Sequence, residues 1–217
     1  MNRNEVLSKT RAFVKKELEG ESTGHDYWHL LRVERNAVRI AGNEGGDLFV
    51  VRLAALLHDI ADWKFHDGDE KASSRRIRAW FKKLKVSEKI TNQVCDIADT
   101  ISFKGAGVKN KMKSKEGKIV QDADRLDALG AIGIARCFAY GGSKKREIYN
   151  PEIKPARHTS FARYKKNQST SINHFYEKLL LLKNRMNTKT GKRLAEGRHQ
   201  FVSYFLKNFM DEWNRKI

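Results

Sequence analysis

Two histidines and two aspartates occupy positions from which they could hold a single divalent metal ion. His58 and Asp59 adjoin within the apolar run 54–60, where packing alone does not explain a charged pair. His29 and Asp122 offer a matching imidazole and carboxylate from distant parts of the chain. Imidazole and carboxylate ligands without thiolate suit a borderline or hard ion with open coordination positions. The set therefore predicts one bound ion, which could be Mn, Mg, Co, Ni, Fe or Zn.

The His58-Asp59 pair also has an ordinary structural interpretation. A buried histidine can be satisfied by a hydrogen bond, and the aspartate beside it can cap a helix or pair with an arginine. The region around Asp122 favours the metal, because three carboxylates occur within the six residues 122–127 of an otherwise apolar segment. Burying such a concentration of negative charge is costly without a cation.

The elements that must position these residues are all expected to be helices. Only two prolines occur, and both lie in one segment, so most of the chain is free to form helix. Apolar residues recur at intervals of three and four over residues 77–84, 90–101 (behind a Ser87 N-cap), 172–186 and 201–213. Other helices are predicted over residues 6–20, 25–41, 48–63 (behind an Asp47 cap) and 119–140.

These helices give an all-α bundle that we expect to be one domain spanning residues 1–217. The metal-binding core would cover residues 22–140, and C-terminal helices over residues 171–215 would pack on it. His29 lies on the second helix, His58 and Asp59 near the end of the third. Neighbouring residues on a helix point about 100° apart, so both members of the pair can reach an ion beside the helix. Loops are expected near residues 43–46, 65–69, 104–118 and 143–170, and the last of these is the one candidate for a lid or a disordered stretch.

The charge of the chain indicates an anionic partner. Lys and Arg number 44 against 26 acidic residues, a formal net charge of +18. Phosphates, nucleic acid and anionic surfaces are the partners that such a balance attracts. The excess is concentrated in residues 104–118 and 143–170, and a solvated lysine-rich surface is an equal alternative to phosphate collection there.

The spacing of the cysteines and the hydropathy of the chain exclude further classes of protein. Cys95 and Cys137 lie in apolar helical patterns without CxxC spacing, so neither a disulfide framework nor a zinc knuckle is indicated. No stretch reaches the apolar length of a signal peptide or a membrane span. We therefore expect a reduced, cytoplasmic protein with no membrane partner.

The order His29, His58-Asp59, Asp122 resembles the H…HD…D pattern of the HD superfamily of metal-dependent phosphohydrolases, which is named for its histidine-aspartate pair. The stretches that carry the resemblance are GHDYWHLLRV (24–33), LLHDI (56–60) and QDADRLDA (121–128), and the similarity extends to residues 198–201. Within the superfamily the chain is similar to small bacterial HD hydrolases, some of which are nucleoside triphosphate pyrophosphohydrolases. The resemblance implies an all-helical fold and ligation of the metal by the four residues named.

The resemblance also implies a catalytic carboxylate at Asp62. Related single-metal nucleotidases carry an acid three residues after the pair, usually Glu, and here the shorter Asp62 has that place. It could orient the attacking water or take its proton, while a salt bridge at the helix end is the structural alternative. A divalent metal lowers the pKa of bound water, to about 7 in zinc enzymes, and polarises the phosphoryl oxygen.

Other residues are candidates for binding substrate or orienting a ligand. Arg125 could hold phosphate, and Asp127 or Asp26 could accept the second N–H of a metal-bound imidazole. Cations outside the pattern could bind phosphate, and aromatic residues such as Tyr149 could stack on a base, although core packing is their commoner role. The full set of candidates is His25, Asp26, Lys104, Arg125, Asp127, Lys144 and Lys145.

The leading hypothesis is a metal-dependent phosphohydrolase whose substrate is a small phosphorylated molecule, in the first place a nucleotide. Release of pyrophosphate from a nucleoside triphosphate is one form of this reaction. The alternatives are a nucleotide monophosphatase or phosphodiesterase of the same superfamily, a non-catalytic metal-binding regulatory module, and a basic nucleic-acid-binding protein. Nucleic acid is the less favoured partner, because neither a helix-turn-helix nor a zinc finger occurs. The sequence carries no signal for an oligomeric state.

Overall fold

The structure, a computed structural model, describes residues 1–61, 69, 71–165 and 169–216. Every regular element in this part of the chain is helical and it contains no strand, so the expected all-α class is confirmed. The helices group into two compact units, each with its own core. The first comprises Met1–Ser102 and Lys111–Asp124, and the second Phe103–Asn110 and Arg125–Ile217. Among the described residues, no helix has the length and apolar character needed to cross a bilayer.

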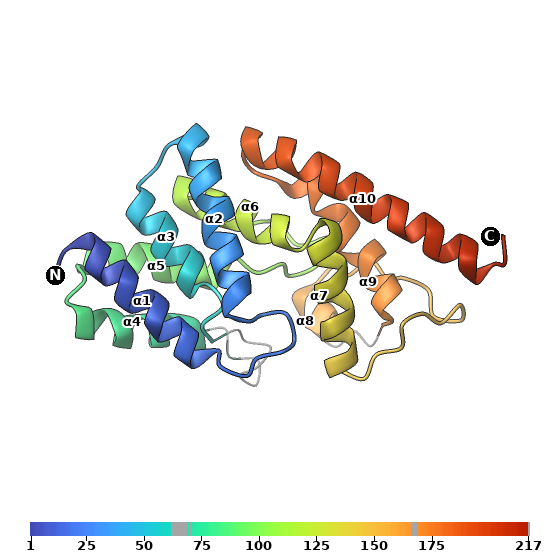
Figure 1. Cartoon of the computed structure of the whole chain (residues 1–217), viewed down its shortest axis with the longest axis horizontal. Helices are drawn as coiled ribbons and strands as arrows, with labels where there is room; N and C mark the ends of the chain where they lie inside the picture. Colours follow the sequence, from blue (N-terminus) through green and yellow to red (C-terminus); the bar gives the residue numbers. More distant parts are fainter. Residues whose placement is uncertain (62–68, 70, 166–168, 217) are drawn as a thin grey trace. The chain divides into compact units, whose positions relative to one another are not determined.

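The described residues of the first unit form the helices labelled α1 to α6 in Figure 1. They are α1 (Arg3–Glu17), α2 (Tyr27–Glu44), α3 (Leu48–Leu57), α4 (Ala72–Leu84), α5 (Glu88–Thr100) and α6 (Lys115–Asp127), the last of which ends in the second unit. The apolar helix α3 packs against α1, α2 and α5, and α4 packs against α5. This central position explains why every residue of α3 from Phe49 to Leu57 except Arg52 is buried. The run that ends in His58 is therefore the core of the unit.

Side chains at the helix starts fix where α1, α2 and α3 begin. Asn2, Asp26 and Asp47 each accept a hydrogen bond from a backbone N–H of the first turn. Such caps satisfy N–H groups that have no partner within the helix. The Asp47 cap confirms the sequence prediction, whereas Ser87 is the N-cap residue of α5 without a side-chain capping bond.

A buried ion pair ties α1, α2 and α3 together. Glu34 on α2 is 4% exposed. Its carboxylate accepts two hydrogen bonds from Arg11, at 2.7 and 3.1 Å, and one from Arg52 at 2.8 Å. Two guanidinium groups therefore compensate one buried carboxylate, as burial of a charge requires.

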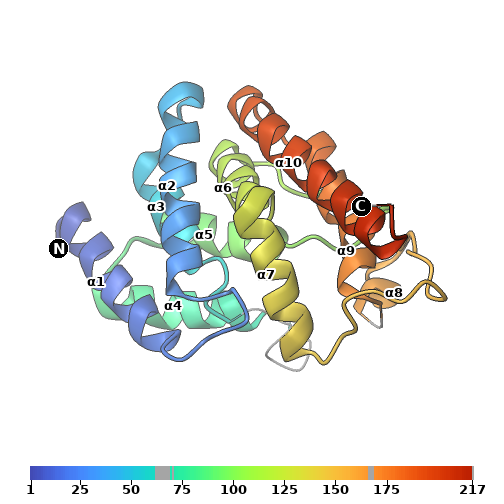
Figure 2. The same ribbon diagram turned by 45° about the vertical axis from the view of Figure 1, so that its right-hand side comes forward.

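The second unit is built on α7 (Gly130–Ser143), α9 (Ser171–Glu177) and α10 (Lys189–Trp213), with the short helix α8 (Phe161–Lys165) and the 3-10 turns Leu179–Leu181 and Lys183–Arg185. Figure 2 shows α7 and α10 side by side, and the two helices are in contact. Phe138, Phe175 and Phe205 form its aromatic core, with ring centroids 5.8–6.0 Å apart. Ring pairs at such separations stabilise a core beyond their buried area.

The prediction of a single helix over residues 119–140 is wrong, because the helix is interrupted between the end of α6 and the start of α7. Gly130 has a φ of +74°, which glycine adopts without a steric penalty. A Cβ at Gly133 would lie 2.3 Å from the carbonyl carbon and oxygen of Ala128. Gly133 can lie this close to Ala128 only because it has no Cβ, and the chain turns here instead of continuing the helix.

Other elements also differ from the sequence expectation. The single helix predicted over residues 172–186 is interrupted, because α9 ends at Glu177 and two 3-10 turns follow it. The helix predicted over residues 48–63 ends at Leu57, so His58 and Asp59 lie just beyond α3 in a turn closed by the Ile60 N–H and the Leu57 carbonyl. The segment 143–170, expected to be a loop, contains the helix α8.

Candidate metal centre

Three of the predicted ligands converge in the first unit. His29 is on the first turn of α2, and His58 and Asp59 follow the last residue of α3. One ligand atom from each lies within 4.8 Å of the other two. The Nε2 atoms of His29 and His58 are 3.4 and 3.6 Å from Oδ2 of Asp59. Both imidazoles are buried, so the group is enclosed by the core that α3 forms.

The carboxylate found beside the two imidazoles on α6 is that of Asp124. Its Oδ1 atom lies 3.7 Å from Nε2 of His29 and 3.7 Å from Nε2 of His58. Asp122, which the sequence indicated as the fourth ligand, is fully buried two residues earlier on the same helix. Residues two apart on a helix point about 200° apart, so Asp122 and Asp124 cannot face the same point. These distances make Asp124 a second candidate for the fourth position, beside Asp122.

A hydrogen bond fixes the tautomer of His58. Its Nδ1 lies 2.9 Å from the carbonyl oxygen of Ala55, one turn earlier. A carbonyl only accepts, so Nδ1 carries the proton and donates. In the neutral ring the lone pair is then on Nε2, the atom that faces Asp59 and Asp124. This Nε2 is buried and makes no hydrogen bond within the described residues.

The electrostatics of the group are those of a site that attracts a cation. Burial disfavours the charged form of His58, but Asp59 and Asp124 outweigh it and raise the pKa of His58 to about 9. Burial likewise disfavours the charged carboxylates, yet His58 beside them lowers the pKa of both Asp59 and Asp124. Two ionised carboxylates thus lie beside the pair of imidazoles. Their negative charge favours a positive charge at this position, which a proton on His58 supplies.

The donor set and its spacing fit a divalent ion. Two ligand atoms each about 2.1 Å from one ion, at tetrahedral or octahedral angles, stand about 3.0–3.4 Å apart. The observed imidazole to carboxylate distances are 3.4–3.7 Å. The orphaned Nε2 of His58, with its other nitrogen bonded to a carbonyl, is the arrangement expected of a metal-binding histidine. Nitrogen and oxygen donors without sulfur suit a borderline or hard cation.

Asp26 and His25 lie next to this group in the first unit. Asp26 caps α2, and its Oδ1 accepts the backbone N–H of His29 at 2.7 Å. The His25 ring centroid is 5.9 Å from that of His29, and its Nδ1 is 3.3 Å from the Thr23 hydroxyl. Asp26 therefore positions the backbone of His29, while His25 is half-buried at the edge of the group.

The remaining candidates fall in two places. Asp62 lies outside the described residues. Arg125, Asp127, Lys104, Lys144 and Lys145 all belong to the second unit.

Within the second unit, Arg125 and Asp127 have structural partners. Arg125 donates a hydrogen bond to the carbonyl oxygen of Arg185. The buried carboxylate of Asp127 accepts one from Arg136 at 3.1 Å. Both side chains therefore take part in holding this unit together.

The three lysines are more accessible. Lys144 and Lys145 follow the end of α7, where the ammonium group of Lys144 lies 5.8 Å from the Tyr140 ring. The ammonium group of Lys104 lies 4.8 Å from the Phe161 ring. Lys104 and Lys144 therefore each offer a positive charge close to an aromatic face.

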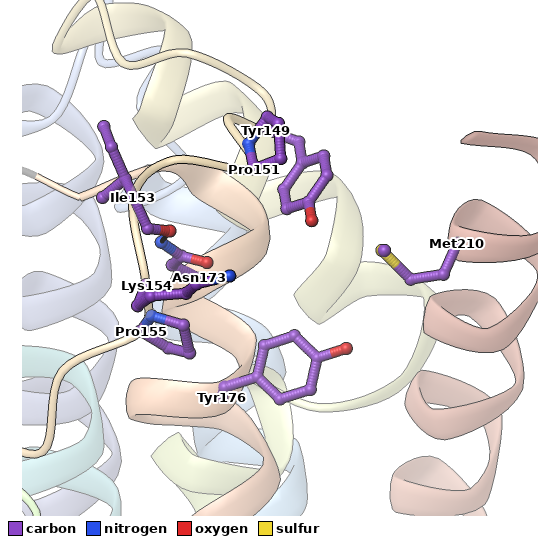
Figure 3. A pocket seen from close by; sticks show the side chains of 8 residues that line it. All are labelled: Tyr149, Pro151, Ile153, Lys154, Pro155, Asn173, Tyr176 and Met210. Carbon is purple, nitrogen blue, oxygen red and sulfur yellow. Dashed lines mark hydrogen bonds between the residues drawn. The ribbon is translucent and has the colours of Figure 1, made fainter. Parts of the chain in front are cut away.

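A cavity of about 230 Å³ also lies in the second unit (Figure 3). Tyr149, Tyr176 and Met210 line it, together with Pro151, Ile153, Lys154, Pro155 and Asn173. The Asn173 amide donates to the Ile153 carbonyl at 2.7 Å. Tyr149, which the sequence offered for base stacking, meets Trp213 edge to face at 4.9 Å. Part of its ring thus packs against α10 and part lines the cavity.

Comparisons with known proteins agree with this architecture. The family model for the HD domain matches residues 27–129. The YpgQ protein of Bacillus subtilis is 38% identical over 198 residues, covering 91% of this chain and 88% of that protein. Its crystal structure in complex with ADP covers 95% of this chain and 97% of that chain, at 33% identity and a TM-score of 0.74.

Two further crystal structures cover nearly the whole chain. A protein from Lactobacillus plantarum superposes with a TM-score of 0.90 at 36% identity, covering 99% of this chain and 100% of that one. An HD-superfamily hydrolase from Bacillus thuringiensis is 43% identical, with a TM-score of 0.74, covering 98% of this chain and 99% of that one.

The all-helical fold and the histidine-aspartate group define a metal-dependent hydrolase. The chain belongs to the HD superfamily and is a metal-dependent phosphohydrolase.

Proposed function

We propose that the chain hydrolyses a phosphate bond of a nucleotide at a divalent metal held by His29, His58, Asp59 and Asp124. The observation that carries the proposal is the convergence of two imidazoles and two carboxylates, with a buried His58 Nε2 aimed into the group. The complex of the YpgQ relative with ADP supports a nucleotide as the substrate class.

Each side chain would have a separate role in such a metal site. His29 and His58 would supply neutral nitrogen donors, and Asp59 and Asp124 would supply negative charge that favours a divalent ion. Ala55 keeps the His58 ring in the required tautomer, and Asp26 holds the start of α2 so that His29 stays in place. A bound ion would supply a Lewis acid beside the phosphoryl group and lower the pKa of the attacking water. Asp62 remains the proposed acceptor of the proton from that water.

Cleavage of a nucleoside triphosphate to the monophosphate and pyrophosphate is the specific reaction that we propose. Monophosphatase and phosphodiesterase activities are the alternatives, and the products separate all three. A panel of nucleoside triphosphates, monophosphates and cyclic nucleotides should be incubated with Mn²⁺, Mg²⁺, Co²⁺, Ni²⁺, Fe²⁺ or Zn²⁺. Pyrophosphate and orthophosphate would then be quantified separately.

The expected result is pyrophosphate formation that stops with EDTA and in His58→Ala. His199→Ala is the matched control, because His199 is a partly exposed histidine of α10 outside the metal group. Orthophosphate from monophosphates, or opening of cyclic esters, would replace the specific reaction with one of the alternatives. A preparation that binds metal but turns over no nucleotide would reject the proposal in favour of a regulatory module.

A further inference from the structure

The ring of Phe103 in the second unit has two cationic side chains over it. The Cζ atom of Arg185 lies 4.9 Å from the ring centroid, and Nζ of Lys178 lies 5.8 Å from it. Like charges that converge on one half-buried ring repel each other and are partly removed from water. Phe103, Lys104, Arg157, His158, Lys178 and Arg185 are together called the Phe103 cluster below.

The charge of Arg185 is held in place by backbone and not by an acid. Its guanidinium group donates a hydrogen bond to the carbonyl oxygen of Ala106, in the loop that carries Phe103. Within the described part of the chain, Arg185 makes no ion pair with a carboxylate. Burial, and then repulsion from Arg157, lowers the pKa of Arg185. The guanidinium group is thus held in a fixed position. An anion bound beside it would compensate both its burial and its repulsion from Arg157.

A buried imidazole adjoins the same rings. His158 is 8% exposed, and its Nε2 atom has no hydrogen-bond partner among the described residues. Its ring meets Tyr164 edge to face at 5.8 Å, and Tyr164 meets Phe103 at 5.4 Å. The His158 carbonyl accepts the N–H of Gly107 at 3.0 Å, which fixes it to the loop of residues 103–110. A buried polar atom without a partner is costly and indicates a group that binds there.

We propose that the Phe103 cluster is a binding site for a nucleoside triphosphate, with Lys178 and Arg185 contacting the phosphates and the aromatic rings contacting the base. Guanidinium and ammonium groups are the usual partners of phosphate, and aromatic faces stack on bases. The proposal rests on the proposed function for its choice of ligand. It requires nothing of the metal centre, because all of its residues belong to the second unit.

A single-stranded nucleic acid presents the same phosphate and base groups, repeated along a strand. The net charge of +18 would favour its binding. The cluster favours the smaller ligand, because its cations converge on one ring and do not follow an extended track. A purely structural function is the other competitor, in which Arg185 only fastens the loop through Ala106. The experiment must separate these three.

Binding of ATP to the full-length protein should be measured by calorimetry in EDTA, so that neither metal nor turnover contributes. Variants Lys178→Ala and Arg185→Ala are expected to weaken ATP binding tenfold or more, and inorganic triphosphate should compete with ATP. Lys192→Ala is the matched control, since it removes an exposed charge from α10 of the same unit. It should stay within twofold of the unmodified protein. His58→Ala should still bind ATP, so a failed hydrolysis assay and a failed binding site are distinguishable.

Three results would overturn the proposal. Unchanged ATP affinity in both cluster variants is the first. A loss confined to Arg185→Ala, together with a lowered Tm, would show that Arg185 only fastens the loop. If the cluster variants lose binding of a labelled oligonucleotide while keeping that of ATP, the ligand is a nucleic acid.

Discussion

Nε2 of His58 lies 3.7 Å from Oδ1 of Asp124, so the loop after α3 and the helix α6 meet through one imidazole and one carboxylate. His29 is at the same distance from that oxygen. Asp124 is thus a second candidate for the position that the sequence pattern assigned to Asp122, and the two aspartates provide a matched pair of test positions on one helix.

Replacing Asp124 by Asn should abolish tight metal binding, whereas Asp122→Asn should retain it. Loss of a group that only orients a ligand costs about 10–100-fold in metal affinity, and loss of a direct ligand should exceed about 100-fold. Calorimetric titration with Mn²⁺ and metal analysis of the dialysed proteins measure the difference. Metal loss in Asp122→Asn alone would return the fourth position to Asp122.

Metal should stabilise the folded chain, because the four donors are assembled only in the folded state. At a metal concentration about 100 times the Kd, the gain is about 2.7 kcal/mol. For a chain of this size that corresponds to a rise in Tm of about 5–10 °C. Thermal unfolding with Mn²⁺ and with EDTA provides the measurement, and an equal shift in His58→Ala would contradict a metal centre at this histidine.

Breaking the ion pair of Glu34 should destabilise the first unit strongly. Glu34→Gln would leave the guanidinium groups of Arg11 and Arg52 facing a neutral amide. Breaking a buried pair costs about 3–5 kcal/mol, and we expect about 3 kcal/mol because the side chain of Arg11 is 37% exposed. The control is Glu5→Gln, which removes an exposed pair with Lys9 on α1 and should cost less than about 0.5 kcal/mol. Urea unfolding would contradict the expectation if both variants lost the same stability.

Replacement of two glycines of α7 by alanine should have different effects on the stability of the protein. At Gly133 a Cβ would meet the backbone of Ala128, so Gly133→Ala should destabilise the protein by about 1–3 kcal/mol. At Gly142 nothing lies within 4 Å of the added Cβ, so Gly142→Ala should be neutral or stabilise by up to about 1 kcal/mol. Similar unfolding midpoints for the two variants would show that α7 does not approach Ala128 this closely.

The two thiols should be inert in the folded protein. Burial raises the pKa of Cys95 to about 11 and that of Cys137 to about 12. At pH 8 a thiol of pKa 11 is about one-thousandth ionised, against about a quarter for an unfolded cysteine. Because folding disfavours the thiolate, stability should fall as the pH rises above about 8.5, the pKa of the unfolded thiol. Iodoacetamide labelling at pH 8 should therefore be slow without urea and fast in urea, and rapid labelling of the native chain would refute this.

The helical class and the starts of α2, α3, α5 and α9 could be predicted from the sequence, because they depend on local signals. The Asp47 cap and the apolar spacing of α4 and α5 act within a few residues. The break before Gly130 could not be read in the same way. The apolar pattern continues through it, and only the approach of Gly133 to Ala128 shows that the chain must turn.

The residue types of the metal group could be predicted from the sequence, whereas its fourth member stays a prediction between Asp122 and Asp124. His29, His58 and Asp59 stand out because each is a polar residue in an apolar setting. Asp122 and Asp124 are equally placed in the sequence, and the choice depends on how α6 is rotated about its axis, a property of tertiary packing. Of the Phe103 cluster only Lys104 was a candidate from the sequence, because the members come from four separate stretches of the chain.

Through its ion pair with Glu34, the N-terminal helix α1 helps to hold the metal-binding residues in place, although α1 carries none of the proposed ligands. A truncation that starts after Glu17 would remove Arg11 and uncover the face of α3 on which α1 packs. α2 and α3 carry His29 and lead into His58, so trimming this end should loosen the alignment of the two imidazoles. Shortened versions made for crystallisation or assay are therefore expected to lose metal before they lose helix content.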